Sequence, residues 1–541
     1  MAHALAGKPV QEQDIIDVQT IVDAYFDNVP DMTNPTQLVS FGTSGHRGTS
    51  VDGTFTDLHV AAITQAICDG RKQFGATGPI FVGQDTHALS QPALVTVLEV
   101  LAGNGVTAMV DCDMDFVPTP SVSRAIIRYN EEHDDKADGI IITPSHNPPD
   151  NGGIKYNTII GGPADTVVTK WIEMRANEYL TAYCESEDFK RISIDNIEPT
   201  AQVPYDYKGL YVEELGDVIN MEAIKAAGPK VLVDTLGGSG ASYWNAIKER
   251  YGLDLTIIHD DYDPTFSFMT YDHDGKVRMD CSSTYVMASV INRIGDFDLA
   301  VGNDPDYDRY GIVVSSGLIS ANTFLTLAAR YLFTTRGWKN KGVGKTVVCT
   351  TMIDKWAADA EIPVFEVPVG FKYFSQLLFD GAIGIGGEES AGASFLKKDG
   401  TVWTTDKDGM IMALLSMEIM AVMGKSALKM ADESLEEFGN PSFDRIDAPC
   451  KKEQKQILKQ MSAELITATT VDGDPITNIR TTSLYNDMPI DGVRVETDKG
   501  WFVARPSGTE DLYKIYGESY KGDLGLVALL TAGEEIVNAA L

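Results

Sequence analysis

Short β-rich runs alternate with amphipathic helical stretches along most of this chain, and that alternation restricts its fold more than any other feature. The first strand-like runs lie at 79–83, 106–110 and 138–142, with a helical stretch at 92–102. The pattern begins again at 230–234. Its further segments are helices at 242–250, 284–293, 323–333 and 409–423, and strands at 253–258, 297–301, 346–349 and 382–385. Such alternation indicates α/β layers with largely parallel sheets.

The C-terminal part of the chain has a different character. A helical stretch at 451–465 is followed by strand-like runs at 492–497 and 500–504, which predicts a separate α+β domain. A chain of 541 residues also exceeds the size of one hydrophobic core. Breaks in the periodicity and clusters of turn-forming residues place the domain boundaries. The predicted domains are 1–205, 206–320, 321–440 and 441–541.

The net charge of −34 argues against nucleic acid or an anionic membrane as a partner. Any phosphate site must therefore be a local concentration of arginine and lysine. The six cysteines are far apart and form no Cys-x-x-Cys pair, so we expect reduced, buried thiols in a cytoplasmic protein. The N-terminus has no apolar signal-peptide core, and the most apolar helical run, 410–423, is too short to span a bilayer.

Three aspartates at every second position, Asp304, Asp306 and Asp308, follow the apolar run 297–301. Alternate side chains of an extended backbone point the same way, so we expect the three carboxylates to converge. Hard oxygen ligands of this kind suit Mg²⁺ or Ca²⁺. The calcium-loop spacing is not met, because Arg309 stands where that loop needs glycine. A Mg²⁺ site beside an arginine remains, with a solvated acidic turn as the alternative.

A second motif, Thr143-Pro-Ser145-His146-Asn147, follows the strand-like run 138–142. Loops at the carboxyl ends of parallel strands hold the sites of α/β proteins. A serine beside proline and histidine is held stiffly next to a group that can accept its proton. A Pro-rich turn with a structural histidine is the alternative. The Gly-x-Ser-x-Gly frame of a hydrolase nucleophile is absent from this stretch.

Two further loops carry polar groups among small residues. In the stretch 386–392, Glu388 and Ser390 would suit hydrogen bonding to sugar hydroxyls, although such a loop alone more often forms a solvated turn. The second loop combines a guanidinium with hydroxyls and accessible backbone N–H groups, which is the donor set for a phosphate dianion. Its residues are Arg505, Ser507, Gly508 and Thr509, followed by Lys514.

The sequence Gly344-Lys345-Thr346 ends like a nucleotide-binding P-loop, but Lys339 stands where the first glycine of that motif is required. It also leads into the strand-like run 346–349 and not into a helix. We interpret it as a turn.

Four loops in this order resemble those of the α-D-phosphohexomutase superfamily. They are Pro-Ser-His-Asn-Pro at 144–148, Asp-x-Asp-x-Asp-Arg at 304–309, Gly-Glu-Glu-Ser at 387–390 and Arg-x-Ser-Gly-Thr at 505–509. The stretches 41–48, 269–280 and 368–374 are similar to the bacterial-type, glucose-specific members. The resemblance runs from residue 41 to residue 519.

This resemblance implies four domains around a central cleft, three with mixed α/β sheets flanked by helices and a smaller α+β C-terminal lid. Ser145 would carry a phosphoryl group and would hold Mg²⁺ together with Asp304, Asp306 and Asp308. The implied candidates for proton transfer are Lys155, Lys372 and His146, with Arg47 steadying the reacting phosphate. The implied substrate contacts are Arg309, Arg278, Glu388, Ser390, Arg505, Ser507, Gly508, Thr509 and Lys514.

The resemblance also implies reversible interconversion of glucose 1-phosphate and glucose 6-phosphate through phosphoserine. Glucose 1,6-bisphosphate would be the intermediate and activator. A hexose phosphate is then the expected partner, with monomer and homodimer both open. A phosphomannomutase is the nearest alternative within the same class. A catalytically silent binding protein and a phosphatase are the alternatives from other classes.

Overall fold

The computed structural model divides the chain into two compact units. The described residues are 3–42, 44–184, 189–506 and 512–541. The first unit comprises Met1–Ile319, Ser375–Gly381 and Ser390–Ala427. The second unit comprises Ser320–Phe374, Ala382–Glu389 and Leu428–Leu541. The strands within the described ranges form four separate sheets.

The first sheet has the strand order β1-β5-β4-β2-β3-β6 and is mixed, because β1 and β5 run antiparallel to their neighbours. Its strands are β1 (Gly45–Thr49), β2 (Ile80–Gln84), β3 (Ala108–Asp111), β4 (Asp138–Ile142), β5 (Asn151–Asn157) and β6 (Gln202–Tyr205). The accompanying helices are α1 (Val18–Asp27), α2 (Asp57–Gly70), α3 (Ser90–Gly103), α4 (Thr119–Glu132) and α5 (Thr166–Cys184). β2 pairs in parallel with both β3 and β4, so the carboxyl ends of these three strands share one edge.

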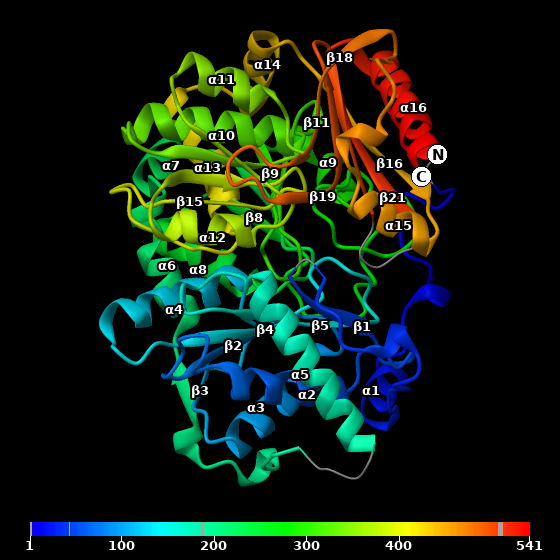
Figure 1. The fold of residues 1–541 in the computed structure, drawn as a ribbon. Coiled ribbons are helices and arrows are strands. Elements are labelled where there is room, and N and C mark those ends of the chain that lie inside the picture. Colours follow the sequence, from blue (N-terminus) through cyan, green and yellow to red (C-terminus); the bar gives the residue numbers. More distant parts are fainter. Residues whose placement is uncertain (1–2, 43, 185–188, 507–511) are drawn as a thin grey trace. The chain divides into compact units, whose positions relative to one another are not determined.

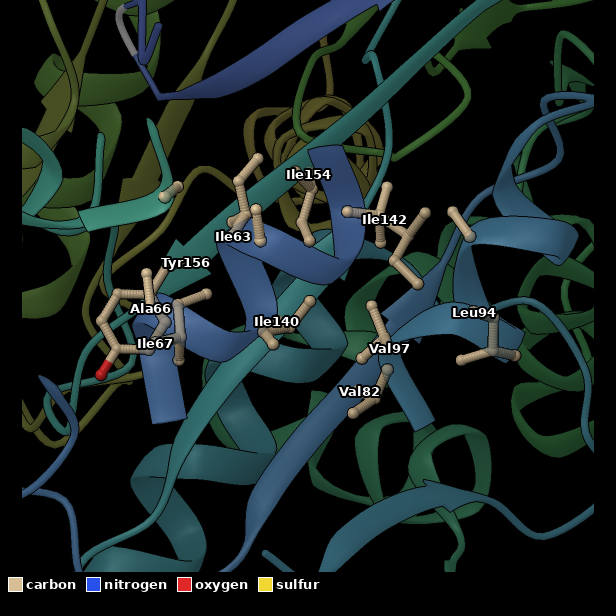
Figure 2. Packing of buried hydrophobic residues seen from close by; sticks show 14 of the residues in the cluster. Ile63, Ala66, Ile67, Val82, Leu94, Val97, Ile140, Ile142, Ile154 and Tyr156 are labelled. Carbon is tan, nitrogen blue, oxygen red and sulfur yellow. The ribbon is translucent and has the colours of Figure 1, made fainter. Parts of the chain in front are cut away.

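Alternate residues of the central strands bury opposite faces of this sheet, with helices on both sides (Figure 1). On one face, Val82 and Ile140 pack with α2 and α3 side chains such as Ile63 and Val97 (Figure 2). On the other face, Phe81 packs with α4. Full burial of one such aliphatic side chain contributes about 1.5–3 kcal/mol, so both faces hold the loops at the strand ends firmly.

The second sheet, in the order β11-β10-β9-β7-β8, belongs to the first unit. Its elements are α6 (Tyr207–Val218), α7 (Met221–Ala227), β7 (Val231–Asp234), α8 (Ala241–Tyr251), β8 (Leu255–Ile258), α9 (Ala288–Ile291), β9 (Leu299–Gly302), β10 (Gly311–Val314) and β11 (Gly317–Leu318). The helix expected over 284–293 was too long, because only Ala288–Ile291 is helical and turns precede it.

The third sheet has the order β13-β12-β14-β15. The elements of this region are α10 (Ala321–Arg336), β12 (Gly342–Thr346), α11 (Met352–Asp359), β13 (Val364–Val367), α12 (Lys372–Phe379), β14 (Ile383–Gly387), β15 (Ala393–Phe395), α13 (Gly409–Met423) and α14 (Ala427–Phe438). The strand expected at 346–349 was misplaced, and the interpretation of Gly344-Lys345-Thr346 as a turn was wrong. These residues form the buried end of β12, where they pair in parallel with β13 and β14, and the turn follows them.

The fourth sheet is antiparallel and has the order β16-β21-β20-β19-β18-β17. Its elements are β16 (Ser442–Pro449), α15 (Lys452–Lys459), β17 (Thr470–Val471), β18 (Asp474–Thr482), β19 (Pro489–Thr497), β20 (Gly500–Pro506), β21 (Leu512–Ser519) and α16 (Gly522–Ala540). The helix expected over 451–465 ends at Lys459, and a short 3₁₀ turn, Ala463–Leu465, follows. Helices α15 and α16 pack against this sheet, as an α+β domain requires.

The N-terminal segment, which carried no motif in the sequence, pairs with the loop that begins at Met269. Backbone hydrogen bonds join Gly7 to Tyr271 and Val10 to Met269 at 2.8 and 3.0 Å. Leu5 and Val10 pack against the apolar core beneath that loop. The segment therefore adds a short antiparallel pairing to the domain of the second sheet.

Among the described residues, no single helix is long and apolar enough to cross a membrane. Two consecutive helices, Gly409–Met423 and Leu428–Phe438, meet the length and composition criteria only when taken together. The expectation of buried thiols holds for Cys281, Cys349 and Cys450 but was wrong for Cys112, which is exposed just after β3.

Candidate active site

Ser145 lies in the loop after β4 and is almost completely buried, with 1% of its surface exposed. Its backbone is left-handed, with φ +63°, a conformation that a residue with a side chain adopts only when its surroundings enforce it. Its Oγ donates a hydrogen bond to Asp304 Oδ2 at 3.0 Å and lies 3.2 Å from His146 Nδ1. The loop therefore presents the serine hydroxyl to the aspartate cluster and to one imidazole nitrogen.

The three aspartates converge as expected, and each has a carboxylate oxygen within 4.8 Å of the others. The expected reason, an extended backbone, was wrong. The chain turns here, because the Tyr307 N–H donates to the Asp304 carbonyl at 2.8 Å and Tyr307 is left-handed, with φ +62°. A turn brings the first and last carboxylates closer together than a strand, in which every second residue lies about 6.6 Å further along.

Lysines lie against this cluster. Lys155, on β5, places its Nζ 2.6 Å from Asp306 Oδ2 and 3.2 Å from Asp308 Oδ2. Lys407 lies 2.9 Å from the same oxygen of Asp308. Lys407 was not predicted, because nothing in the sequence links it to a loop so far upstream. The sequence signal nearest to it is the polar run Asp406-Lys407-Asp408 immediately before the helix α13.

Burial and mutual repulsion displace the carboxylate pKa values in opposite directions. Burial, reinforced by the charges of Asp306 and Asp308, raises the pKa of Asp304 well above its ordinary value. Burial also favours the neutral form of Asp308, but Lys407 and Lys155 outweigh it and lower the pKa of Asp308. The cluster thus combines one carboxylate that ionises reluctantly with another that is held as an anion.

The pKa values of two proton-transfer candidates in this unit, Lys155 and His146, are shifted in opposite directions. Burial alone would lower the pKa of Lys155, but Asp306 and Asp308 raise it above the ordinary value, so Lys155 is held as an ammonium ion. Burial and the nearby Arg309 lower the pKa of His146 well below its ordinary value. His146 Nε2 lies 3.8 Å from Asp280 Oδ2, which also accepts a hydrogen bond from Arg309 at 3.3 Å.

Two arginines, Arg47 and Arg309, also lie near the aspartate cluster. Arg47, on β1, is electrostatically coupled to Asp304, Asp306 and Asp308. Its Nε, like that of Arg309, is buried and has no hydrogen-bond partner among the described residues. By contrast, Arg278 donates to Asp274 through Nε and Nη2, at 3.1 and 3.0 Å. The loop with Arg278 is tied to the serine loop, because the Met279 N–H donates to the His146 carbonyl at 3.1 Å.

The remaining predicted residue of the first unit is Ser390, which is half-buried in the loop between β14 and β15. Lys372 and Glu388 belong to the second unit. Glu388 is buried, and its Oε1 accepts a hydrogen bond from the Gly370 N–H at 3.1 Å. Lys372 begins α12.

Arg505 and Lys514 stand directly opposite each other on β20 and β21 in the second unit. Arg505 Nε donates to the Ile490 carbonyl at 2.8 Å. On the other side of β21, Lys514 stands opposite Asp447 of β16, so a carboxylate already faces this lysine. The other predicted residues of this loop, Ser507, Gly508 and Thr509, lie outside the described residues.

Models of the phosphoglucomutase/phosphomannomutase family match four successive segments of the chain. Its α/β/α domains I, II and III match residues 38–182, 210–317 and 320–438, and its C-terminal domain matches residues 446–524. The chain is 46% identical over 539 residues to the phosphoglucomutase of Komagataeibacter xylinus, a match that covers 99% of this chain and 97% of that protein.

Two solved structures share the fold. One is the Paramecium phosphoprotein parafusin, described as a phosphoglucomutase in an open form, with a TM-score of 0.73 at 20% identity, covering 95% of this chain and 96% of that one. The other is a phosphoglucomutase/phosphomannomutase family protein of Burkholderia thailandensis, with a TM-score of 0.70 at 21% identity, covering 93% and 98%.

Proposed function

The chain belongs to the phosphoglucomutase/phosphomannomutase family, and we propose that it is a phosphoglucomutase that interconverts glucose 1-phosphate and glucose 6-phosphate. The observation that carries this proposal is the position of Ser145 beside the aspartate cluster, in a chain 46% identical to a phosphoglucomutase. A phosphoryl group on Ser145 would pass to the free hydroxyl of the substrate and give glucose 1,6-bisphosphate. That intermediate would reorient and return its other phosphoryl group to Ser145.

The donor set of the cluster fits a hard divalent cation. Asp306 Oδ1 and Asp308 Oδ1 are buried and have no hydrogen-bond partner among the described residues. Carboxylate oxygens without nitrogen or sulfur ligands favour Mg²⁺ over Zn²⁺. Asp304, Asp306, Asp308 and a phosphoserine oxygen at Ser145 would hold Mg²⁺. When bound, the ion withdraws charge from the transferring phosphoryl group.

The positively charged side chains would orient the phosphoryl group. Arg47 and Arg309 each have a buried Nε that can donate to a phosphate oxygen. Lys155 and Lys407 already neutralise the carboxylates, so a dianion can approach them without meeting a net negative cluster. Such positioning supplies much of the acceleration in phosphoryl transfer.

The position of His146 makes it a candidate proton acceptor for the return step. Its Nδ1 lies 3.2 Å from Ser145 Oγ, and its lowered pKa keeps the imidazole neutral at pH 7. Ser145 must lose its proton when it receives the phosphoryl group back. Lys155, whose pKa is raised, suits charge stabilisation better than the role of a base. Lys372 is a further candidate for proton transfer, and Glu388 and Ser390 are the candidates for the sugar hydroxyls.

A phosphate held at Arg505 and Lys514 would anchor the end of the substrate that is not reacting. Arg278 is a further substrate contact. The domains 1–205, 206–320, 321–440 and 441–541 would each contribute one loop. Hexose phosphate is the proposed partner, and the protein would act in the cytoplasm as a monomer or homodimer.

The test is a coupled assay of glucose 6-phosphate formed from glucose 1-phosphate, with Mg²⁺ and a trace of glucose 1,6-bisphosphate. Mannose 1-phosphate is assayed in parallel. A large preference for glucose supports the proposal, and comparable rates would indicate a dual-specificity mutase. Absence of turnover with both sugars, from folded protein, would overturn it in favour of a silent relative.

Asp306→Asn tests the metal assignment separately. We expect the Mg²⁺ concentration for half-maximal activity to rise at least tenfold and turnover to fall, because one charged ligand is lost. An unchanged response to Mg²⁺ would remove Asp306 from the site.

A further inference from the structure

Two buried residues, Asp85 and His87, hold both ends of the loop that carries Ser145 through hydrogen bonds. Both follow β2, the strand beside β4 in the first sheet. Each is 1% exposed. Among the described residues, the aspartate cluster includes neither of them, and the hydrogen-bond partners of Ser145 Oγ are Asp304 and His146.

The first fastening acts through Thr143. The Ser145 N–H donates to Thr143 Oγ1 at 2.7 Å, and the Thr143 hydroxyl donates in turn to Asp85 Oδ2 at 2.6 Å. The Thr143 N–H also donates a hydrogen bond, to the Gly153 carbonyl of β5 at 2.9 Å. The left-handed backbone of Ser145 is thus tied to a buried carboxylate through one hydroxyl.

The second fastening acts through the imidazole of His87. Its Nδ1 lies 2.8 Å from Asp85 Oδ2, and its Nε2 lies 3.0 Å from the Asn147 carbonyl. Carboxylate and carbonyl oxygens only accept hydrogen bonds, so both ring nitrogens donate. The imidazole therefore bridges the carboxylate that holds Thr143 and the far end of the same loop.

Asp85 is itself fixed by its neighbours. Its N–H donates to the Ile142 carbonyl at 3.0 Å, and its Oδ1 accepts hydrogen bonds from Ser90 Oγ and the His87 N–H at 2.5 and 3.0 Å. Both carboxylate oxygens are therefore occupied. A fully satisfied buried network of this kind is rigid and permits a single arrangement.

We propose that Asp85, His87 and Thr143 are positioning residues that hold the Ser145 loop in its left-handed conformation for phosphoryl transfer. This inference rests on the proposed mutase function and assigns a task to residues that take no part in binding the metal or the sugar. A nucleophile displaced by about 1 Å loses about 10²-fold in rate while substrate binding is little affected. Disrupting these hydrogen bonds should therefore lower kcat and leave KM nearly unchanged.

The test compares Thr143→Val with Thr96→Val in the full-length protein. Valine keeps the shape of threonine and removes the hydroxyl. Thr96, in α3, is equally buried. Its hydroxyl makes hydrogen bonds with Tyr25 and Asp57 at 2.9 and 2.7 Å. Both variants therefore lose a buried hydroxyl that is hydrogen-bonded. We expect Thr143→Val to lower kcat about 10²-fold with KM within about twofold, and Thr96→Val to leave both unchanged.

His87 supplies the second comparison. In His87→Gln the amide can donate to the Asn147 carbonyl, whereas His87→Phe keeps the ring and removes both donors. We expect Gln to retain at least tenfold more turnover than Phe. Single-turnover transfer from ³²P-labelled phosphoserine to glucose 1-phosphate should fall in parallel with kcat.

The outcomes separate this inference from the proposed function. An inactive wild-type protein would overturn the mutase assignment. An active wild-type protein with a folded Thr143→Val variant whose kcat is within threefold would overturn the positioning role. Equal losses in Thr143→Val and Thr96→Val would also overturn it, because the effect would then reflect stability alone.

Discussion

Lys407→Met should destabilise the first unit and strengthen the Mg²⁺ binding proposed for its aspartate cluster. Lys407 Nζ lies 2.9 Å from Asp308 Oδ2, and its side chain is only 12% exposed. At an effective dielectric constant of about 20, unit charges at that distance attract by about 6 kcal/mol, from which the cost of burying the lysine is subtracted. Loss of one partner of a buried ion pair typically costs about 3–5 kcal/mol. We expect about 3 kcal/mol, because Lys155 remains 3.2 Å from the same oxygen.

Thermal unfolding followed with and without Mg²⁺ measures both effects. In domains of about 150–250 residues, a loss of about 3 kcal/mol lowers the Tm by about 6–12 °C, and the larger first unit should show a smaller decrease. Removing a positive charge beside the carboxylates also removes its repulsion of Mg²⁺. Saturating Mg²⁺ should therefore raise the Tm of Lys407→Met by more than it raises the Tm of the wild type.

Lys170→Met is the matched control, because Lys170 lies 2.7 Å from Glu173 Oε1 but is 61% exposed. An exposed pair contributes about 0–1 kcal/mol, so this Tm should shift by no more than about 2–4 °C. Equal losses of stability in the two variants would contradict the role given to Lys407 in neutralising Asp308. So would an Mg²⁺-induced increase in Tm that is no larger for Lys407→Met than for the wild type.

Three further outcomes are expected. Ser145→Ala should abolish turnover and leave the circular dichroism spectrum unchanged; residual turnover near wild type would remove the serine from its role. Arg505→Ala should raise KM for glucose 1-phosphate at least tenfold with a smaller change in kcat, and a normal KM would place the distal phosphate elsewhere. Burial lowers the pKa of His59 to about 3, so the unfolded chain alone gains that proton below about pH 6.5. Stability should fall by up to about 1.4 kcal/mol per pH unit as the pH drops from 6.5, and His59→Gln should flatten that slope in urea titrations at pH 7 and pH 5.

Local sequence patterns predicted most of the fold because hydrophobic periodicity is a property of neighbouring residues. The α/β alternation and the C-terminal α+β domain are confirmed, and the helix predicted at 409–423 has those bounds. The errors occur where tertiary pairing overrides local pattern. The sequence from Gly344 to Thr346 is typical of a turn, but these residues lie in β12 because they pair in parallel with β13 and β14.

The candidate site was predictable only where its residues are close in sequence. The aspartates lie within five residues, so their convergence could be inferred even though the mechanism, a left-handed Tyr307, could not. Lys407 contacts Asp308 because packing brings the start of α13 to the aspartate loop, and hydrophobic periodicity does not predict such a long-range contact. The same holds for Asp85 and His87, whose partners lie about sixty residues further along the chain.

The acidity of the chain makes the local charge balance decisive for phosphate binding. A protein of net charge −34 repels a sugar phosphate at long range, so attraction must arise within the site. There, the carboxylates are opposed by nearby cations. The carboxylates are Asp280, Asp304, Asp306, Asp308 and Asp406, and the cations are Arg47, Lys155, Arg309 and Lys407. Such a cluster is close to neutral and gives a dianion little net attraction. A divalent cation would bind at the Oδ1 atoms of Asp306 and Asp308, which accept no hydrogen bond from the described residues, and would make the net charge positive. Metal binding and phosphate binding should therefore strengthen each other reciprocally.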